Sequence, residues 1–529
     1  MCKDGTQMPT TKRLPRWDYT LLETSYPTIL AKRKAVSRLY QTMYRIFLIF
    51  CYNYTLSKNL KCKVLKPKKH IKDMVHKEFL GLRLTMENLF LEQWNNPELP
   101  CMEKVSSANL VSWLRKNDFQ VTTGPHNIPT SFIAKSKPKV SGPNIGIIAE
   151  YDALPGLGNE AIPKRKATGK LSGHGCGHNH IGTANTGAAI IAAKVCKNLN
   201  IAGNISVIGC PAEEILWGKI ALLNKGAFSD LDCILTSHGD YQNGSMVRPC
   251  QSVVAGELIF EGKSGHGGNI SENNALTAVE ILTQSIQQKI RPKFPEILFR
   301  HVIRQGGMIP TITPEESRVW YATRGFDFNE VKAAYNTIID ISRNLSTELK
   351  IGFHHQFISE TRGYLPNETL GKELFKALEQ VGPPKWSTKD LIFMEKLVAE
   401  LEPEKPMTLD KKIGYYDNDA DYFGQDDGEV SWRIPLGRLN WAYPLEVPIH
   451  HWAWTALSGN KASNAGPLMV SEALALTIVN LLSNPKLIEN SQKELIQKTK
   501  GIILDSPRFG AFKTLTQFPK LFWEGTWRE

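Results

Sequence analysis

The pattern of apolar and polar positions changes at about residue 72. Between Met74 and Gln93, apolar residues recur with the spacing of one face of an amphipathic helix. From there to residue 250, apolar runs typical of buried strands alternate with helical stretches. The strands are expected at 120–123, 140–148, 204–210 and 231–236, and the helices at 107–116 and 182–197. This alternation predicts an α/β domain with a mostly parallel sheet that is covered by helices on both faces.

Residues 251–363 break this rhythm. Their pattern predicts strand, helix, strand, strand, helix and strand, at 252–261, 275–288, 297–304, 316–324, 328–345 and 348–358. This β-α-β-β-α-β order is that of a ferredoxin-like unit. Helical patterns resume at 367–380 and end with 468–482. We therefore expect a main α/β domain at 76–250 and 364–490, interrupted by an inserted α+β domain at 251–363, with a C-terminal tail at 491–529.

The first 75 residues are expected to form a basic, poorly ordered N-terminal extension. They hold 16 lysines and arginines against 4 acidic residues, whereas the other 454 residues hold 48 of each. Because the main domains carry no basic excess, nucleic acid is not expected as a partner. The apolar run at 46–52 is shorter than the about 20 residues that cross a bilayer, so no stable membrane span is expected. A membrane-surface or targeting segment, or a true start near Met74, are the alternatives for this region.

Composition narrows the class of protein further. The chain has 529 residues, of which 42% are hydrophobic and 22% charged, as in ordinary globular proteins. Its nine cysteines are scattered and include no C-x-x-C pair. This usage argues against a disulfide framework and against a zinc ribbon, and it favours a reducing compartment such as the cytoplasm.

The segment 173–180, Gly-His-Gly-Cys-Gly-His-Asn-His, concentrates residue types that bind metals. Cys176 and His178 stand two apart in a glycine-rich turn before a helix, so both side chains can reach one ion. Thiolate and imidazole are ligands that zinc and other late first-row divalent ions favour. Taken alone, the pattern is equally that of a tight glycine-rich helix start with incidental histidines.

Two further predicted strand ends carry residues of the same kind. Glu213 and Glu214 follow the strand at 204–210, and adjacent side chains there point in different directions. One carboxylate can therefore bind a metal while the other takes a proton from water whose pKa the metal has lowered. His238 follows the next strand. Each residue could be structural by itself, but three consecutive strand ends deliver ligand types to one edge of the sheet.

The order of the motifs resembles the amidohydrolase branch of the aminoacylase/carboxypeptidase zinc-peptidase superfamily, and most closely its p-aminobenzoyl-glutamate hydrolases. The likeness covers roughly residues 75–490. Its seven motifs lie at 150–157, 173–179, 211–214, 265–266, 363–367, 428–432 and 448–450. The resemblance implies a metal-dependent amidohydrolase acting on an N-acyl or N-aroyl amino acid. A dipeptidase or aminoacylase of the same superfamily is the alternative, followed by a non-catalytic metal-binding relative. A serine or cysteine hydrolase is disfavoured, because the chain has no G-x-S-x-G elbow and a Cys176 nucleophile would leave Glu213, Glu214 and His238 without a role.

Carried over to this sequence, the resemblance implies two divalent metal ions per chain, manganese or zinc. The implied ligands are Cys176, His178, Glu214, His238 and His450, with Cys176 able to bridge the two ions. Glu213 is the implied general base, which later protonates the leaving amine. His450 is preferred to the adjacent His451 because the Pro-x-His spacing fits the family.

The resemblance also assigns roles in the inserted domain. His266 would stabilise the oxyanion of the reaction, often by reaching across a dimer, and Thr311 stands where the family has a substrate-side asparagine. Arg324 could hold a substrate carboxylate, although an ordinary surface arginine is an equal reading. A homodimer is expected, with a hetero-oligomer that includes a related subunit as the alternative. The bulky segment 215–218 replaces a glycine-rich stretch of the family, and Gly239 replaces its proline, which predicts a reshaped substrate pocket.

Overall fold

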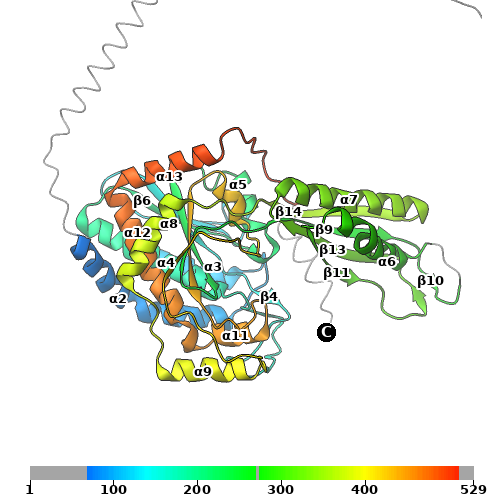
Figure 1. The fold of residues 1–529 in the computed structure, drawn as a ribbon, viewed down its shortest axis with the longest axis horizontal. Helices are drawn as coiled ribbons and strands as arrows, with labels where there is room; N and C mark the ends of the chain where they lie inside the picture. The colour runs from blue at the N-terminus through cyan, green and yellow to red at the C-terminus, as the bar shows by residue number, and fades with distance from the viewer. Residues whose placement is uncertain (1–67, 270–272, 511–529) are drawn as a thin grey trace, which may run out of the picture. The chain divides into compact units, whose positions relative to one another are not determined.

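The computed structural model describes residues 68–269 and 273–510 (Figure 1). The predicted basic extension therefore lies outside the described residues up to residue 67. Its last eight residues belong to the first described helix, α2 (Lys68–Asn95). At the other end, α13 (Pro485–Lys498) continues past the expected boundary at residue 490, because its helical pattern runs on to Lys498.

An eight-stranded sheet forms the centre of the main domain, in the order β1-β2-β6-β3-β7-β16-β8-β15. The four middle strands are parallel: β6 (Asn204–Gly209), β3 (Asn144–Ala149), β7 (Cys233–Asp240) and β16 (Leu436–Ala442). The outer strands are β1 (Gln120–Thr123), β2 (Phe132–Lys135), β8 (Gly244–Met246) and β15 (Gly414–Tyr416), and both β2 and β8 run antiparallel to their inner neighbours. The predicted α/β class with a mostly parallel sheet is confirmed.

Alternate side chains of the middle strands enter two different hydrophobic cores. Ile145 and Ile147 of β3 pack in the larger core, whereas Ile148 points to the opposite face and packs in a second one. The larger core is covered by α2, α3 (Lys104–Lys116), α4 (His178–Leu199), α8 (Glu368–Val381), α9 (Thr388–Ala399), α11 (Trp452–Ser458) and α12 (Ala465–Ser483). The short helices α5 (Gly218–Asn224) and α10 (Asp427–Ser431) contribute to the second core. Burial of both faces explains why these strands appear as continuous apolar runs instead of alternating ones.

The inserted region folds as the β-α-β-β-α-β unit that its pattern predicts. Its elements are β9 (Ser252–Glu261), α6 (Ala275–Ser285), β11 (Leu298–Gln305), β13 (Glu316–Gly325), α7 (Phe328–Glu348) and β14 (Gly352–Thr361). The strands form an antiparallel sheet in the order β11-β13-β9-β14, and α6 and α7 cover one face of it (Figure 1). Two short strands, β10 (Gly265–His266) between β9 and α6 and β12 (Ile312–Thr313) between β11 and β13, pair as a small separate ladder. The inserted domain has a hydrophobic core of its own, in which Leu258 is fully buried.

Strand β16 lies between β7 and β8, although β7 and β8 follow each other directly in the sequence. The apolar pattern did not predict this strand, because it places Arg438 and Asn440 inside the protein. Both are buried and paired: Arg438 contacts Asp427 at 2.6 Å, and Asn440 donates to Asp240 at 2.8 Å. Charge and amide pairing thus allow two polar residues in a central strand.

One helical stretch within the described residues, Lys461–Ser483, is long and apolar enough to cross a membrane by composition. Its most apolar part is 89% buried inside the protein. It contains α12, which packs against α4, α2 and α8 in the larger core. This stretch therefore serves as the central core helix of the main domain.

Candidate metal centre

Parallel strands bring the predicted ligands to one edge of the central sheet. His238 lies near the end of β7, Glu213 and Glu214 form a turn just after β6, and Cys176 and His178 flank Gly177 at the start of α4. Gly177 has a φ of 87°, a left-handed conformation that glycine adopts at little cost. The resulting sharp turn allows Cys176 and the first residue of α4 to face the same point.

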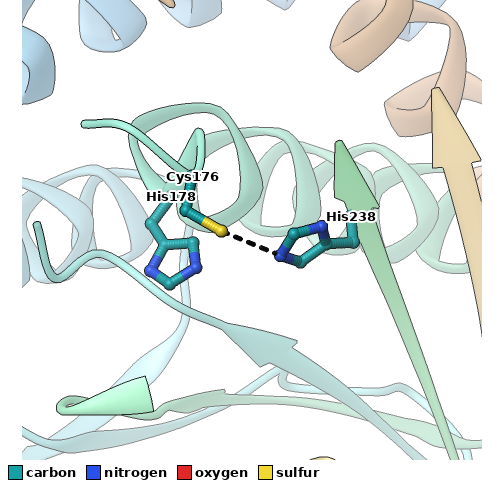
Figure 2. Close-up of side chains that lie close together, drawn as sticks. All are labelled: Cys176, His178 and His238. Atoms are coloured by element: carbon teal, nitrogen blue, oxygen red, sulfur yellow. Dashed lines mark hydrogen bonds between the residues drawn. The ribbon is translucent and has the colours of Figure 1, made fainter. Parts of the chain in front are cut away.

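Cys176, His178 and His238 form the first half of the cluster (Figure 2). The Cys176 thiol lies 3.5 Å from Nε2 of His238, and the two histidine rings are 5.9 Å apart in an edge-on arrangement. Nδ1 of His238 donates to the carbonyl oxygen of Gly239 at 2.7 Å, which leaves Nε2 free to act as a ligand. Burial lowers the pKa of His238 to about 3, so its ring is neutral at pH 7, as a metal ligand must be.

Asp152 orients two of the predicted ligands at once. Its Oδ1 lies 2.9 Å from Nδ1 of His178, and its Oδ2 accepts a hydrogen bond from the backbone N–H of Glu214 at 2.9 Å. Nε2 of His178 then faces Oε2 of Glu213 at 3.6 Å and Oε1 of Glu214 at 3.8 Å. Carboxylate support of this kind is typical of histidines that bind metals. Asp152 lies within the motif at 150–157, but its sequence context gave no indication of this role.

The second half of the cluster consists of Cys176, Glu214 and His450. Nε2 of His450 lies 3.4 Å from Oε2 of Glu214, and the backbone N–H of His450 donates to Gly175 at 2.9 Å. His450 has a φ of 61°, a strained conformation that turns its side chain towards the site. The adjacent His451 instead caps α11, where its side chain accepts from the N–H of Ala453. The structure therefore brings His450, and not His451, to the cluster.

Several buried polar atoms of this cluster have no hydrogen-bond partner among the described residues. They include Nε2 of His178, Oε1 of Glu213 and Oε1 of Glu214. Burial raises the pKa of the Glu213 carboxyl well above its usual range, although the Lys219 ammonium acts in the opposite direction. Buried carboxylates without donors are costly, and a bound cation removes that cost. Sulfur, nitrogen and oxygen donors thus converge in a set that fits divalent transition metals.

The other two histidines of the 173–180 segment serve the hydrophobic core. Nε2 of His174 contacts the carbonyl oxygen of Gln93 at 3.2 Å, and the ring of His180 lies between the Tyr443 and Ser463 hydroxyls at 3.1 and 3.3 Å. Burial lowers the pKa of each to about 3. The structural interpretation of the motif is thus right for these two residues, while Cys176 and His178 face the cluster.

A cavity of about 1340 Å³ opens over the cluster. Its lining includes five of the predicted site residues: Cys176, Glu213, Glu214, His238 and His450. It also includes four aspartates and an arginine, which together are called the acidic wall below: Asp240, Asp410, Asp419, Asp421 and Arg248. Of the bulky residues expected to reshape the pocket, only Leu216 reaches the cavity, because Ile215 and Trp217 are buried in the second core.

The residues predicted in the inserted domain separate into two groups. Arg324, at the end of β13, lines the cavity, and no ion-pair partner contacts its guanidinium among the described residues. His266 lies on the β10–β12 ladder and Thr311 directly precedes β12, where its carbonyl oxygen accepts a hydrogen bond from the N–H of Gly267 at 2.8 Å. Both side chains are exposed, and neither is part of the described lining of the cavity.

Comparison with known proteins gives relatives that span most of the chain, although no family model matches it. The chain is 28% identical over 444 residues to one of the subunits of p-aminobenzoyl-glutamate hydrolase from Escherichia coli, covering 77% of this chain and 91% of that protein. It is 25% identical over 423 residues to the human Xaa-Arg dipeptidase, covering 76% and 86%.

A solved structure supports the fold. A dinuclear metal-binding peptidase of the M20 family from Bacillus subtilis matches with a TM-score of 0.51 and 17% identity, covering 76% of this chain and 99% of that one. Its likeness agrees with the fold that the resemblance of the sequence motifs implies. Together with the convergence of sulfur, nitrogen and oxygen donors at the sheet edge, these relatives confirm the resemblance to metal-dependent amidohydrolases that the sequence motifs indicated.

Proposed function

We propose that this protein hydrolyses the amide bond of an N-acyl or N-aroyl amino acid with the help of two divalent metal ions. The observation that carries the proposal is the buried donor cluster at the floor of the cavity. Cys176 belongs to both halves of this cluster, one with His178 and His238 and the other with Glu214 and His450. This shared position supports Cys176 as the ligand between two ions, manganese or zinc.

Glu213 is the proposed general base. Both glutamates lie near His178, but only Glu214 also contacts His450, which favours Glu214 as the ligand and leaves Glu213 free for proton transfer. Metal ions held here would polarise the substrate carbonyl and lower the pKa of water. Glu213 would take the proton of the attacking water and return it to the nitrogen of the leaving amino acid.

Residues of the inserted domain complete the proposed site. Arg324 would bind a carboxylate of the substrate, since its guanidinium lines the cavity without an ion-pair partner in the described part of the chain. His266 would stabilise the oxyanion, with Thr311 beside it. Because the β10–β12 ladder is exposed and does not line the cavity of its own chain, we propose that His266 reaches the site of a second copy in a homodimer. Association with a related subunit is the alternative to the homodimer, and the proposed location is the cytoplasm.

p-Aminobenzoyl-glutamate is the first candidate substrate, because a relative is named for its hydrolysis and Arg324 suits a glutamate carboxylate. A dipeptide with a basic residue is the second, because four aspartates line the cavity. Arg248 lies 2.6 Å from Asp421 and 4.0 Å from Asp240, so its single charge is already engaged by that wall. The remaining negative charge favours a substrate that carries a cation.

The test is hydrolysis by the purified full chain after removal of metal with a chelator, followed by addition of manganese or zinc. Both p-aminobenzoyl-glutamate and a dipeptide with a C-terminal arginine are offered. We expect activity to return with metal and to be lost in Glu213→Ala, which should still bind metal. Preference for either substrate decides between the two candidates. A chain that binds no metal, or a Glu213→Ala variant with full activity, would contradict the proposed mechanism.

A further inference from the structure

A third buried carboxylate lies beside the metal cluster, and the proposed mechanism gives it no role. Glu150 directly follows β3, and its side chain is 3% exposed. Its Oε1 forms an ion pair with Nζ of Lys219 at 2.7 Å. Its Oε2 has no hydrogen-bond partner among the described residues. One oxygen of this carboxylate is thus firmly held, and the other is buried without a donor.

Lys219 fixes the orientation of Glu150. The lysine lies on α5, is fully buried, and its ammonium group contacts Asp426 as well as Glu150. The backbone N–H of Lys219 also donates to Oδ2 of Asp426 at 2.8 Å. Two carboxylates therefore share one ammonium group, so that one negative charge is left over in the interior whenever both carboxylates are ionised. Such a charge is costly unless a further cation lies nearby.

The free oxygen of Glu150 faces the nitrogen that His178 offers to the metal. Oε2 lies 3.9 Å from Nε2 of His178. The oxygens of Glu213 and Glu214 lie at 3.6 and 3.8 Å from the same nitrogen. Two donors that bind one ion at about 2.0–2.2 Å can be separated by at most about 4.4 Å. The separation between Glu150 and His178 is therefore within what a single ion can bridge.

We propose that Glu150 is a further carboxylate of the metal centre, with Lys219 as the positioning residue that turns its Oε2 towards the ion held by His178. This inference rests on the proposed function only in requiring that a metal binds. Asp426 occupies the other side of the same ammonium group. It therefore provides a matched control, because it pairs with Lys219 but does not contact His178 in the described structure.

The experiment compares Glu150→Gln with Asp426→Asn in the full chain. The affinity for zinc and for manganese is measured by competition with a fluorescent chelator, and the thermal stability of the metal-free proteins is recorded beside it. We expect Glu150→Gln to weaken binding of at least one ion by about 10- to 100-fold. Asp426→Asn should change it less than about threefold, even if it lowers thermal stability more.

Equal losses in the two variants would mean that Glu150 only pairs with Lys219, and unchanged affinity in Glu150→Gln would also overturn the inference. If either variant fails to fold, Glu150→Asp is compared with the wild type instead. The shorter side chain keeps the negative charge but moves the carboxylate oxygen away from His178. Wild-type affinity in Glu150→Asp then contradicts the inference, and a clear loss supports it. Wild-type protein that binds no metal would instead overturn the proposed function, so the two failures are distinguishable.

Discussion

The edge of the central sheet and the β10–β12 ladder both carry residues that the family pattern assigns to catalysis, yet the structure treats them differently. At the sheet edge, five of the six implied residues are nearly or fully buried and lie in one cluster. At the ladder, His266 and the adjacent Thr311 are exposed and lie outside the cavity lining. The geometry of the proposed ligands is thus set by the parallel strands of the central sheet, whereas His266, the proposed oxyanion donor, is attached to two short paired strands.

This difference in burial indicates which functions the sheet edge and the β10–β12 ladder can each perform without the other. Metal binding needs several donors within fractions of an ångström, and buried strand ends supply such precision. A donor that acts only when substrate is present can come from an exposed element that approaches from another domain or another copy. We therefore expect metal binding to depend on the sheet edge alone, and turnover to depend on both regions.

The largest effect is expected from His178→Ala. If this fully buried histidine is a metal ligand as proposed, its removal should abolish stoichiometric metal binding and reduce turnover to background, well beyond the about 10- to 100-fold cost of changing a supporting residue. Metal content by atomic emission and hydrolysis rates measure the two effects. His451→Ala is the control, because that neighbouring histidine caps α11 and should leave metal content unchanged.

The next effect concerns His266→Ala, which should lower kcat by about 10²- to 10³-fold while metal content and thermal stability stay as in the wild type. Loss of metal in this variant would contradict the division between the two regions.

Mixing the two inactive variants sharpens the comparison. If His266 serves the site of a second copy, a mixed dimer of His178→Ala and His266→Ala chains contains one complete site. After subunit exchange, about a quarter of wild-type activity should return, since half of the dimers are mixed. No recovery despite verified exchange would mean that His266 acts within its own chain.

A further prediction concerns the stability of the two regions. Leu258→Ala opens a cavity in the separate core of the inserted domain and should lower the unfolding free energy of that domain by about 2–5 kcal/mol. Leu439→Ala does the same in the larger core of the main domain. We expect calorimetry to resolve two transitions, of which only the one sensitive to Leu439 rises on adding metal. A single transition that both variants shift equally would contradict independent folding of the regions.

The smallest expected effect is a pH dependence at the acidic wall of the cavity. Burial raises the pKa of Asp421 to about 6, although Arg248 acts in the opposite direction. Because an unfolded aspartate titrates near 3.9, the folded state holds this proton more tightly, and the resulting stabilisation is lost as pH rises through about 6. The unfolding free energies of Asp421→Asn and of the wild type are therefore compared by urea denaturation at pH 4.5 and at pH 7. The difference, variant minus wild type, should rise by about 2 kcal/mol from the lower to the higher pH. Asp419→Asn, at an exposed position of the same wall, should follow the wild-type profile.

Much of this architecture was predictable because it depends on local patterns. Strand β9 and strand β1 have the predicted bounds, and the inserted β-α-β-β-α-β order follows from alternation and length alone. Strand β16 was not predicted, since Arg438 and Asn440 interrupt its apolar pattern and are tolerated only through distant partners.

The candidate site was predictable where residue types are clustered in sequence, as at Cys176 and His178. Supporting residues were not, because their roles arise from contacts between distant segments. Lys219 belongs to an ordinary helical stretch, and only the fold brings it between Glu150 and Asp426. Likewise, sequence spacing favoured His450 over His451, but the helix cap made by His451 gives the physical reason for that choice.

The position of β16 between β7 and β8 has a consequence for biosynthesis. The ribosome releases β7 and β8 in succession, but both strands pair with β16. That strand is synthesised only about two hundred residues later, after the whole inserted domain. Pairings of such long sequence separation form slowly. We therefore expect the inserted domain to fold first on the nascent chain and the main sheet to close late. The proposed metal ligands lie on both sides of that gap, so binding of metal would then be the last step of maturation.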